Sequence, residues 1–227
     1  HGTMVSGIIA MRSNLGFGGS GVAPRAQLAG YNVISQGSQN FQNFLDTLGG
    51  SDASSGNDIF SMSYGFNNIK QMPEDNASVR ASLAAFKMGT RQLRNGKGAL
   101  YVKAAGNGFS RLGLFSGFAC QTAVQYNVSC QNSNMNLENS IPEVITVGAV
   151  NARGVKSSYS TTGASLWISA PGGEFGVDKK WVEYHVTKLG DSIAWSDYRA
   201  TIGEPAIVTT DVSGSRYGVS KYAKLLD

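Results

Sequence analysis

The sequence predicts an α/β fold in which a parallel β-sheet is flanked by helices. Short apolar segments that suit strands alternate with longer segments whose apolar residues recur every three or four positions. Two of the strand segments are almost continuously apolar, GALYVKAA at 98–105 and VITVGAV at 144–150, as expected for strands buried on both faces of a sheet. This alternation is the pattern of βαβ units, whose strands run parallel.

The individual elements follow from local composition and spacing. Small and apolar side chains predict the first helix, and the spacing of Val79, Leu83 and Phe86 predicts a later one. The expected elements are, in chain order, a helix at 2–12, a strand at 27–33, a helix at 41–48, a strand at 58–64, a helix at 78–95, and strands at 98–105 and 144–150.

Residues 172–205 depart from this alternation. The segment is long and mixed, and it contains Trp181, His185 and Trp195. A long stretch without clear periodicity is unusual within a compact domain. We therefore expect an insertion with its own local structure, within a single domain that spans residues 1–227.

Composition limits the class of protein. The chain has 227 residues, of which 41% are hydrophobic and 15% charged, which is a globular and not a disordered composition. The net charge is +4, but the basic residues are scattered, so we expect no nucleic-acid partner. No apolar run approaches the roughly 20 residues that span a bilayer, so we expect no membrane partner.

The sequence contains two cysteines, Cys120 and Cys130, in one polar segment. In an oxidising compartment they would close a short loop and stabilise the fold by about 2–3 kcal/mol. The alternative is two unrelated thiols. The sequence leaves both open, with a slight preference for the bridge because no other cysteine competes.

The glycine-rich segment at 16–21 matches the GxGxxG pattern of dinucleotide-binding proteins. That pattern binds pyrophosphate only where it joins a strand to the beginning of a helix. Here it follows a predicted helix and precedes a predicted strand. The segment is therefore interpreted as a loop.

Two polar residues suggest acyl-transfer chemistry, which requires a base for the nucleophile and hydrogen-bond donors for the oxyanion. His1 precedes a predicted helix and is followed by glycine and threonine, so its ring is free of bulky neighbours. Asn107, in AAGNG at 104–108, follows the carboxyl end of a buried strand. Ligands bind at that edge of parallel sheets.

In these segments the chain resembles the subtilisin-like serine proteases. HGTMVSGIIA at 1–10 is similar to the histidine segment of that family, and AAGNG to its oxyanion segment. Other similar segments follow in the order of the family: GVAPRA at 21–26, SMSYG at 61–65, VITVGAV at 144–150, SSYSTTG at 157–163, SAPGG at 169–173 and IVTTD at 207–211.

The resemblance implies a role for each matching residue. His1 would be the general base, and the side chain of Asn107 would donate a hydrogen bond to the tetrahedral oxyanion. The segment Ser63, Tyr64 and Gly65 would bind the substrate as an added strand. Ala105 and Gly106 would line the pocket for the residue before the cleaved bond. The implied partners are polypeptide substrates, and a prodomain or chaperone.

The aspartate and serine segments of that family are not in this sequence. We therefore expect the chain to be the central part of a peptidase domain, incomplete at both ends and inactive alone. The alternative is a subtilisin-fold pseudoprotease that acts as a binding module, which the presence of both His1 and Asn107 disfavours. Another α/β hydrolase is a weaker alternative, because the sequence has no GxSxG elbow.

Within the family, GKGALYVKAAGNG at 96–108 favours the kexin-like branch. Members of that branch prefer basic residues before the cut and use acidic groups to bind them. Thr161 stands where that branch has an acid, and Phe66 follows SYG without one. Specificity for paired basic residues is therefore not expected.

The resemblance also implies a structural Ca²⁺ site in the loop after the first helix. Its ligands would be the side chain of Asn14 and the carbonyl groups of Arg12 and Gly16, because Ca²⁺ prefers oxygen ligands. An ordinary asparagine in a glycine-rich turn is an equally good interpretation. His185 has no suitably spaced partners for zinc. Low charge and high glycine content favour a secreted, extracellular protein, with the periplasm as an alternative.

Overall fold

The computed structural model describes residues 1–16, 18–33, 40–65, 76–109, 120–180 and 201–211. Contacts divide the chain into two compact units, one formed by residues 1–32 and 208–227 and the other by residues 33–207. Each unit is described below by itself. Of the predicted insertion at 172–205, residues 181–200 lie outside the described residues. No helix in the described ranges is long and apolar enough to cross a membrane.

The first unit is built on helix α1, Gly2–Ala10, which confirms the helix predicted at 2–12. Two threonines from much later in the chain hydrogen-bond to the backbone of this helix. Thr209 Oγ1 donates to the Met4 carbonyl at 2.5 Å, and Thr210 Oγ1 donates to the Thr3 carbonyl at 2.7 Å. Gly7 allows this approach, because a Cβ there would lie 2.2 Å from Thr210 Oγ1. Residues 209–210 therefore pack against α1 within this unit.

The strand predicted at 27–33 is wrong. These residues are irregular, and no described strand pairs with them. Leu28, from the apolar run that suggested the strand, is 50% exposed. A strand requires a hydrogen-bonded neighbour to satisfy its backbone groups, and local composition does not supply one.

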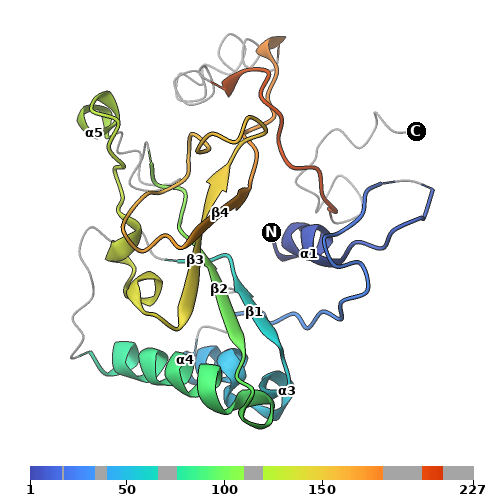
Figure 1. Ribbon diagram of the computed structural model, residues 1–227, viewed down its shortest axis with the longest axis vertical. Coiled ribbons are helices and arrows are strands. Elements are labelled where there is room, and N and C mark those ends of the chain that lie inside the picture. The colour runs from blue at the N-terminus through green and yellow to red at the C-terminus, as the bar shows by residue number, and fades with distance from the viewer. Residues whose placement is uncertain (17, 34–39, 66–75, 110–119, 181–200, 212–227) are drawn as a thin grey trace. The chain divides into compact units, whose positions relative to one another are not determined.

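The second unit contains a four-stranded parallel sheet in the order β1-β2-β3-β4, which confirms the predicted fold class (Figure 1). The strands are β1, Ile59–Met62, β2, Leu100–Ala104, β3, Val144–Val150, and β4, Ile168–Pro171. The first three confirm the predictions at 58–64, 98–105 and 144–150. The fourth was not predicted as a strand, because its four residues carry too little pattern.

Helices of the second unit lie across the beginning of the sheet (Figure 1). The helix predicted at 41–48 is divided into α2, Phe41–Leu45, and a wider helical turn, η1, Asp46–Gly50, and is followed by α3, Asp52–Ser55. The helix predicted at 78–95 is α4, Ala77–Gly96, with non-helical backbone near its end. Asn76 begins α4 by accepting hydrogen bonds from the Ser78 and Val79 amides.

The hydrophobic core lies between these helices and one face of the sheet. Its centre is Tyr101 of β2, which stacks on Phe60 of β1 at 4.8 Å and meets Phe86 of α4 edge-on at 5.0 Å. The buried core residues are Leu48, Phe60, Met62, Phe86, Leu93, Ala99, Tyr101 and Val144. This face of β1 and β2 is buried as the alternation of side chains requires.

The opposite face of the sheet is less covered than its apolar sequence predicts. Ile59 is 60% exposed, Leu100 is 53% exposed and Ile168 is 58% exposed. The expectation of burial on both faces concerned the segments at 98–105 and 144–150; it is wrong for β2, whose Leu100 and Ala104 are exposed, whereas no residue of β3 is exposed. Apolar runs show that a strand suits a buried position, but they do not show which segment covers each face.

The connection between β2 and β3 contains α5, Gln121–Gln125, and two short turns, η2, Ser133–Met135, and η3, Leu137–Ser140. A disulfide joins Cys120 to Cys130 and so confirms the preferred interpretation of the two cysteines. The bridge closes a short loop around α5, within the connection between β2 and β3. It belongs to the class of crosslinks that persist in oxidising compartments.

Candidate active site

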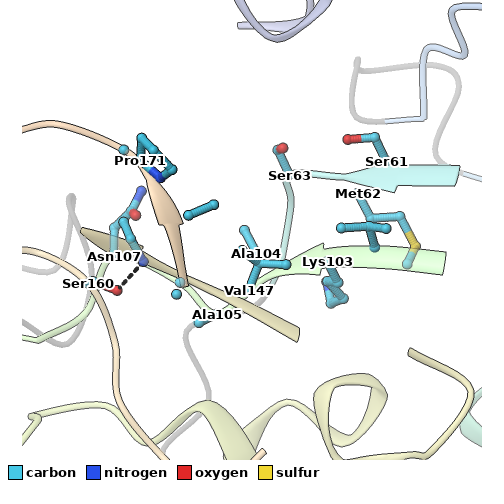
Figure 2. A pocket seen from close by; sticks show the side chains of 16 residues that line it. Ser61, Met62, Ser63, Lys103, Ala104, Ala105, Asn107, Val147, Ser160 and Pro171 are labelled. Atoms are coloured by element: carbon cyan, nitrogen blue, oxygen red, sulfur yellow. Dashed lines mark hydrogen bonds between the residues drawn. The ribbon is translucent and has the colours of Figure 1, made fainter. Parts of the chain in front are cut away.

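The candidate site is a cavity of about 290 Å³ at the carboxyl ends of the parallel strands. Figure 2 shows Ser61 and Ser63 on one side of it, and Asn107 and Pro171 on the other. The lining residues are Ser61–Ser63, Val102–Asn107, Val147–Ala149, Ser160 and Ala170–Gly172. All four strands contribute, so the site lies where ligands bind in parallel sheets.

A glycine turn forms one wall of the cavity. Gly106 has φ of +113°, a backbone conformation that favours glycine. Thr161 holds the turn on its other side: its amide donates to the Gly106 carbonyl at 3.0 Å, and its Oγ1 accepts from the Gly108 amide at 2.8 Å. The turn is therefore fixed on both sides of Asn107, the residue between these two glycines.

Asn107 is exposed at the cavity, and its side-chain amide has no hydrogen-bond partner in the described part of the chain. Its neighbour Ala105 is buried, and the Ala105 amide donates to the Val147 carbonyl at 2.9 Å. The backbone around Asn107 is thus held by hydrogen bonds, while the side-chain amide of Asn107 is available to donate to a ligand in the cavity. This is the arrangement that an oxyanion-stabilising group requires, because its donor must already be in place when charge develops.

The segment Ser63–Gly65 follows β1 at the opposite side of the cavity. Ser63 and Gly65 are exposed, whereas Tyr64 is partly buried and its ring meets Phe44 edge-on at 6.0 Å. Gly65 lies close to the structure beneath it, since a Cβ there would be 3.1 Å from Asn136 Nδ2. The structure thus brings Ser63, Ala105, Gly106 and Asn107 to one cavity. Tyr64 and Gly65 are the next residues in the chain after Ser63 and are not among the lining residues.

A buried charge lies beneath this segment. Lys103 of β2 is 1% exposed, and its Nζ lies 3.3 Å from Glu138 Oε2 and donates to the Tyr64 carbonyl. Burial lowers the pKa of Lys103, while the negative charge and the hydrogen bond of Glu138 oppose that shift. Burial, with a smaller effect of Glu138, raises the pKa of the Tyr64 phenol, so Tyr64 stays neutral.

His1 belongs to the other compact unit, formed by residues 1–32 and 208–227. It lies exposed at the residue before α1, and its side chain makes no hydrogen bond that caps the helix. The ring therefore does not cap α1. Its role as the base stays a prediction.

The calcium ligands predicted after α1 lie in an exposed loop of that same unit. Asn14 has φ of +62° and Gly16 has φ of +80°, which are turn conformations. With Arg12 they offer neutral oxygens only, and the described residues contain no metal-binding cluster of His, Cys, Asp or Glu. Ca²⁺ takes six to eight oxygens, usually with carboxylates, so these three residues do not complete a site. The predicted Ca²⁺ site would be refuted if removal of Ca²⁺ with a chelator left the melting temperature of the full-length protein unchanged.

Sequence reasoning missed Lys103 and Glu138, and it treated Thr161 only as a departure from the kexin-like branch. The signal for Lys103 was present, because it is the one charged residue in the apolar run GALYVKAA. Its partner Glu138 is 35 residues further along, in an irregular connection. Only the folded structure brings the two together.

The chain belongs to the subtilase family of peptidases, whose family model matches residues 1–218. Among its relatives is the Aeromonas extracellular serine protease of Aeromonas sobria, which is 36% identical over 222 residues, 97% of this chain and 31% of that protein. Kexin of Candida albicans is 30% identical over 169 residues, 74% of this chain and 15% of kexin.

Solved structures agree with this assignment. The crystal structure of the Aeromonas sobria serine protease in complex with the chaperone ORF2 has a TM-score of 0.74 at 34% identity, over 96% of this chain and 32% of that chain. The chain therefore spans about a third of the length of the Aeromonas sobria protease.

Proposed function

We propose that the protein containing this chain is a secreted serine endopeptidase. The observation that carries the proposal is the exposed amide of Asn107, held on a rigid glycine turn at a cavity that the segment after β1 also borders. The relatives that support it are named as serine proteases, and the chain belongs to the same family. The nucleophilic serine and the aspartate of the triad would lie outside this sequence.

In this mechanism His1 takes the proton from the serine hydroxyl and passes it to the leaving amine. The attack turns the carbonyl oxygen of the cleaved bond into an oxyanion. Asn107 donates a hydrogen bond to that oxyanion, and Ala105 and Gly106 border the pocket for the residue before the cut. The segment from Ser63 to Gly65 binds the extended peptide as an added strand.

We also propose that the protein belongs to the kexin-like branch of the family but differs from that branch in the residues it prefers before the cut. A basic side chain before the cut is bound best by a carboxylate. No acidic side chain lines the described cavity, and the buried hydroxyl of Thr161 beside it accepts from Gly108. We therefore propose a kexin-like protease without a strong preference for paired basic residues. Cleavage that is at least tenfold faster after two basic residues than after two leucines in matched peptides would refute the restriction.

Secretion and a folding partner complete the proposal. The disulfide between Cys120 and Cys130 suits an oxidising compartment, and one relative is named as extracellular. A related protease has been crystallised with a chaperone. We propose that this protein too is secreted and requires a prodomain or chaperone to reach its folded state.

The test is covalent labelling of the full-length protein with a fluorophosphonate probe, which reacts with activated serines. We expect one adduct on a serine outside residues 1–227, and its loss in His1→Ala. The variant Asn43→Ala, at an exposed position on α2, serves as the control and should label like the wild type. A folded full-length protein that takes no label would overturn the proposal and favour a binding module with the same fold.

A further inference from the structure

We propose that Lys103 is a positioning residue that holds the substrate-binding segment Ser63–Gly65 in place through its contacts with the Tyr64 carbonyl and Glu138. This inference rests on the proposed protease function. It adds a residue that does not touch substrate but sets the position of a segment that does.

The first argument is the place of Lys103 in the sheet. Lys103 pairs with Met62 on the last rung between β1 and β2, directly before the chain leaves β1 to form Ser63–Gly65. Figure 2 shows the Lys103 side chain and Ala104 on opposite sides of β2, with Ala104 toward the cavity. Lys103 therefore acts from beneath the site.

The second argument is that its ammonium group joins three segments of the chain. It donates to the Tyr64 carbonyl after β1, it lies 3.3 Å from Glu138 on η3, and its own backbone is part of β2. It also lies 4.6 Å from the centre of the Tyr64 ring. One group thus sets the distance between the segment after β1 and the turn that precedes β3.

The third argument is the cost of this arrangement. A buried ammonium group loses its hydration, and a buried ion pair often stabilises a fold no more than apolar residues of the same size would. The same face of β2 is packed around Tyr101 with aromatic and aliphatic side chains, so an apolar residue at position 103 would extend the core. A lysine here is better explained by the geometry it imposes than by the stability it adds.

The contact also selects which backbone groups face the peptide. In an extended segment, the N–H and C=O groups of one residue point to one side and those of its neighbours to the other. The Tyr64 carbonyl already accepts a hydrogen bond from Lys103 Nζ. The polar backbone groups of Ser63 and Gly65, which are both exposed, are then the ones presented to a substrate strand.

The experiment compares a long and a short substrate in the full-length protein. The long one is a synthetic peptide that spans a bond the protein cleaves in denatured casein, with several residues before that bond. The short one is the ester of the single residue before that cut, which cannot reach along Ser63–Gly65. Rates are expressed per active site titrated with the fluorophosphonate probe, so misfolded molecules are not counted.

We expect Lys103→Met to lower kcat/KM about tenfold for the peptide, mainly through KM, with less than a twofold change for the ester. Glu138→Gln keeps the hydrogen-bonding capacity and removes the charge, so we expect a loss of about threefold for the peptide alone. Lys87→Met makes the same substitution at an exposed lysine of α4 and should change neither rate.

A Lys103→Met variant that loses both rates equally, or keeps the ratio of peptide to ester within twofold, would overturn the inference. If Lys103→Met gives no active sites that react with the probe, the test is made on Glu138→Gln. An unchanged ratio of kcat/KM for the peptide to kcat/KM for the ester in that variant would then overturn the inference. A wild type that takes no probe at all is the failure of the proposed function, and so the two failures are distinguishable.

Discussion

Tyr101 and Lys103 lie two positions apart on the same buried face of β2, yet they belong to different kinds of structure. Around Tyr101, aromatic rings of β1 and α4 pack within 5.0 Å, and the phenol donates to the Leu48 carbonyl at 2.6 Å. Around Lys103, the contacts are a carbonyl, a carboxylate and one ring face. Apolar packing surrounds the first residue and directed polar contacts surround the second.

The difference separates the tasks of stability and positioning. Apolar contacts stabilise in proportion to buried area and tolerate small shifts, whereas hydrogen bonds depend strongly on distance and angle. The packed region lies toward the beginning of the sheet, and the polar region at the carboxyl end beside the cavity. We therefore expect changes in the first region to alter unfolding, and changes in the second to alter kinetics.

The largest effect on stability is expected from Gly89→Ala in α4. The added Cβ would lie 1.8 Å from Tyr101 Oη, so the helix or the ring must move. Overpacking of this kind costs about 1–3 kcal/mol, and we expect a value near the upper end. Thermal unfolding measures the loss, while kcat per titrated active site should stay unchanged.

The matched control is Gly56→Ala, because a Cβ at Gly56 meets nothing within 4 Å and its φ is −84°. Its melting temperature should stay close to that of the wild type. A Gly89→Ala variant that melts like this control would show that the aromatic core is not tightly packed, and the contrast between the two regions would fail.

A smaller effect, which depends on pH, is expected from Tyr101→Phe. At pH 8 the variant leaves the Leu48 carbonyl without this donor, which costs about 1–2 kcal/mol. Burial raises the pKa of Tyr101 to about 12 from its ordinary value of 10.0. Between these values the unfolded chain loses the proton and the folded chain keeps it, so the wild type loses about 1.4 kcal/mol of stability per pH unit.

Because phenylalanine does not ionise, the advantage of the wild type over Tyr101→Phe should shrink above pH 10 and vanish near pH 11. Thermal unfolding of both proteins from pH 8 to 11 measures this change. Tyr126→Phe, at a tyrosine that is 73% exposed, serves as the matched control. A difference between wild type and Tyr101→Phe that does not depend on pH would contradict the assignment of this phenol to the core.

Sequence patterns predicted the packed region better than the polar one. The spacing in α4 and the runs that form β2 and β3 placed most of the core, because periodicity reports burial directly. The segment at 27–33 had similar composition but forms no strand, since pairing depends on a partner elsewhere in the chain. The contact between Lys103 and Glu138 depends on the path of an irregular connection, which leaves no periodic signal.

At the cavity, the sequence correctly placed Asn107 beyond the carboxyl end of a buried strand. The turn at Gly106 has a backbone conformation that favours glycine. The role of Thr161 in holding that turn was not visible, because its partner Gly108 is 53 residues away. Sequence therefore located the residue that would act on substrate, and the structure supplied the residues that hold it.

The central claim is that Asn107 stabilises an oxyanion, and the most direct measurement is kcat and KM for peptide hydrolysis by the full-length Asn107→Ala variant. In subtilisin, a member of this family, loss of one such donor lowers kcat by about 10²–10³, and we expect a fall of that order with KM nearly unchanged. The exposed Asn43→Ala variant should keep the wild-type kcat. A folded Asn107→Ala variant whose kcat falls less than threefold would contradict the account.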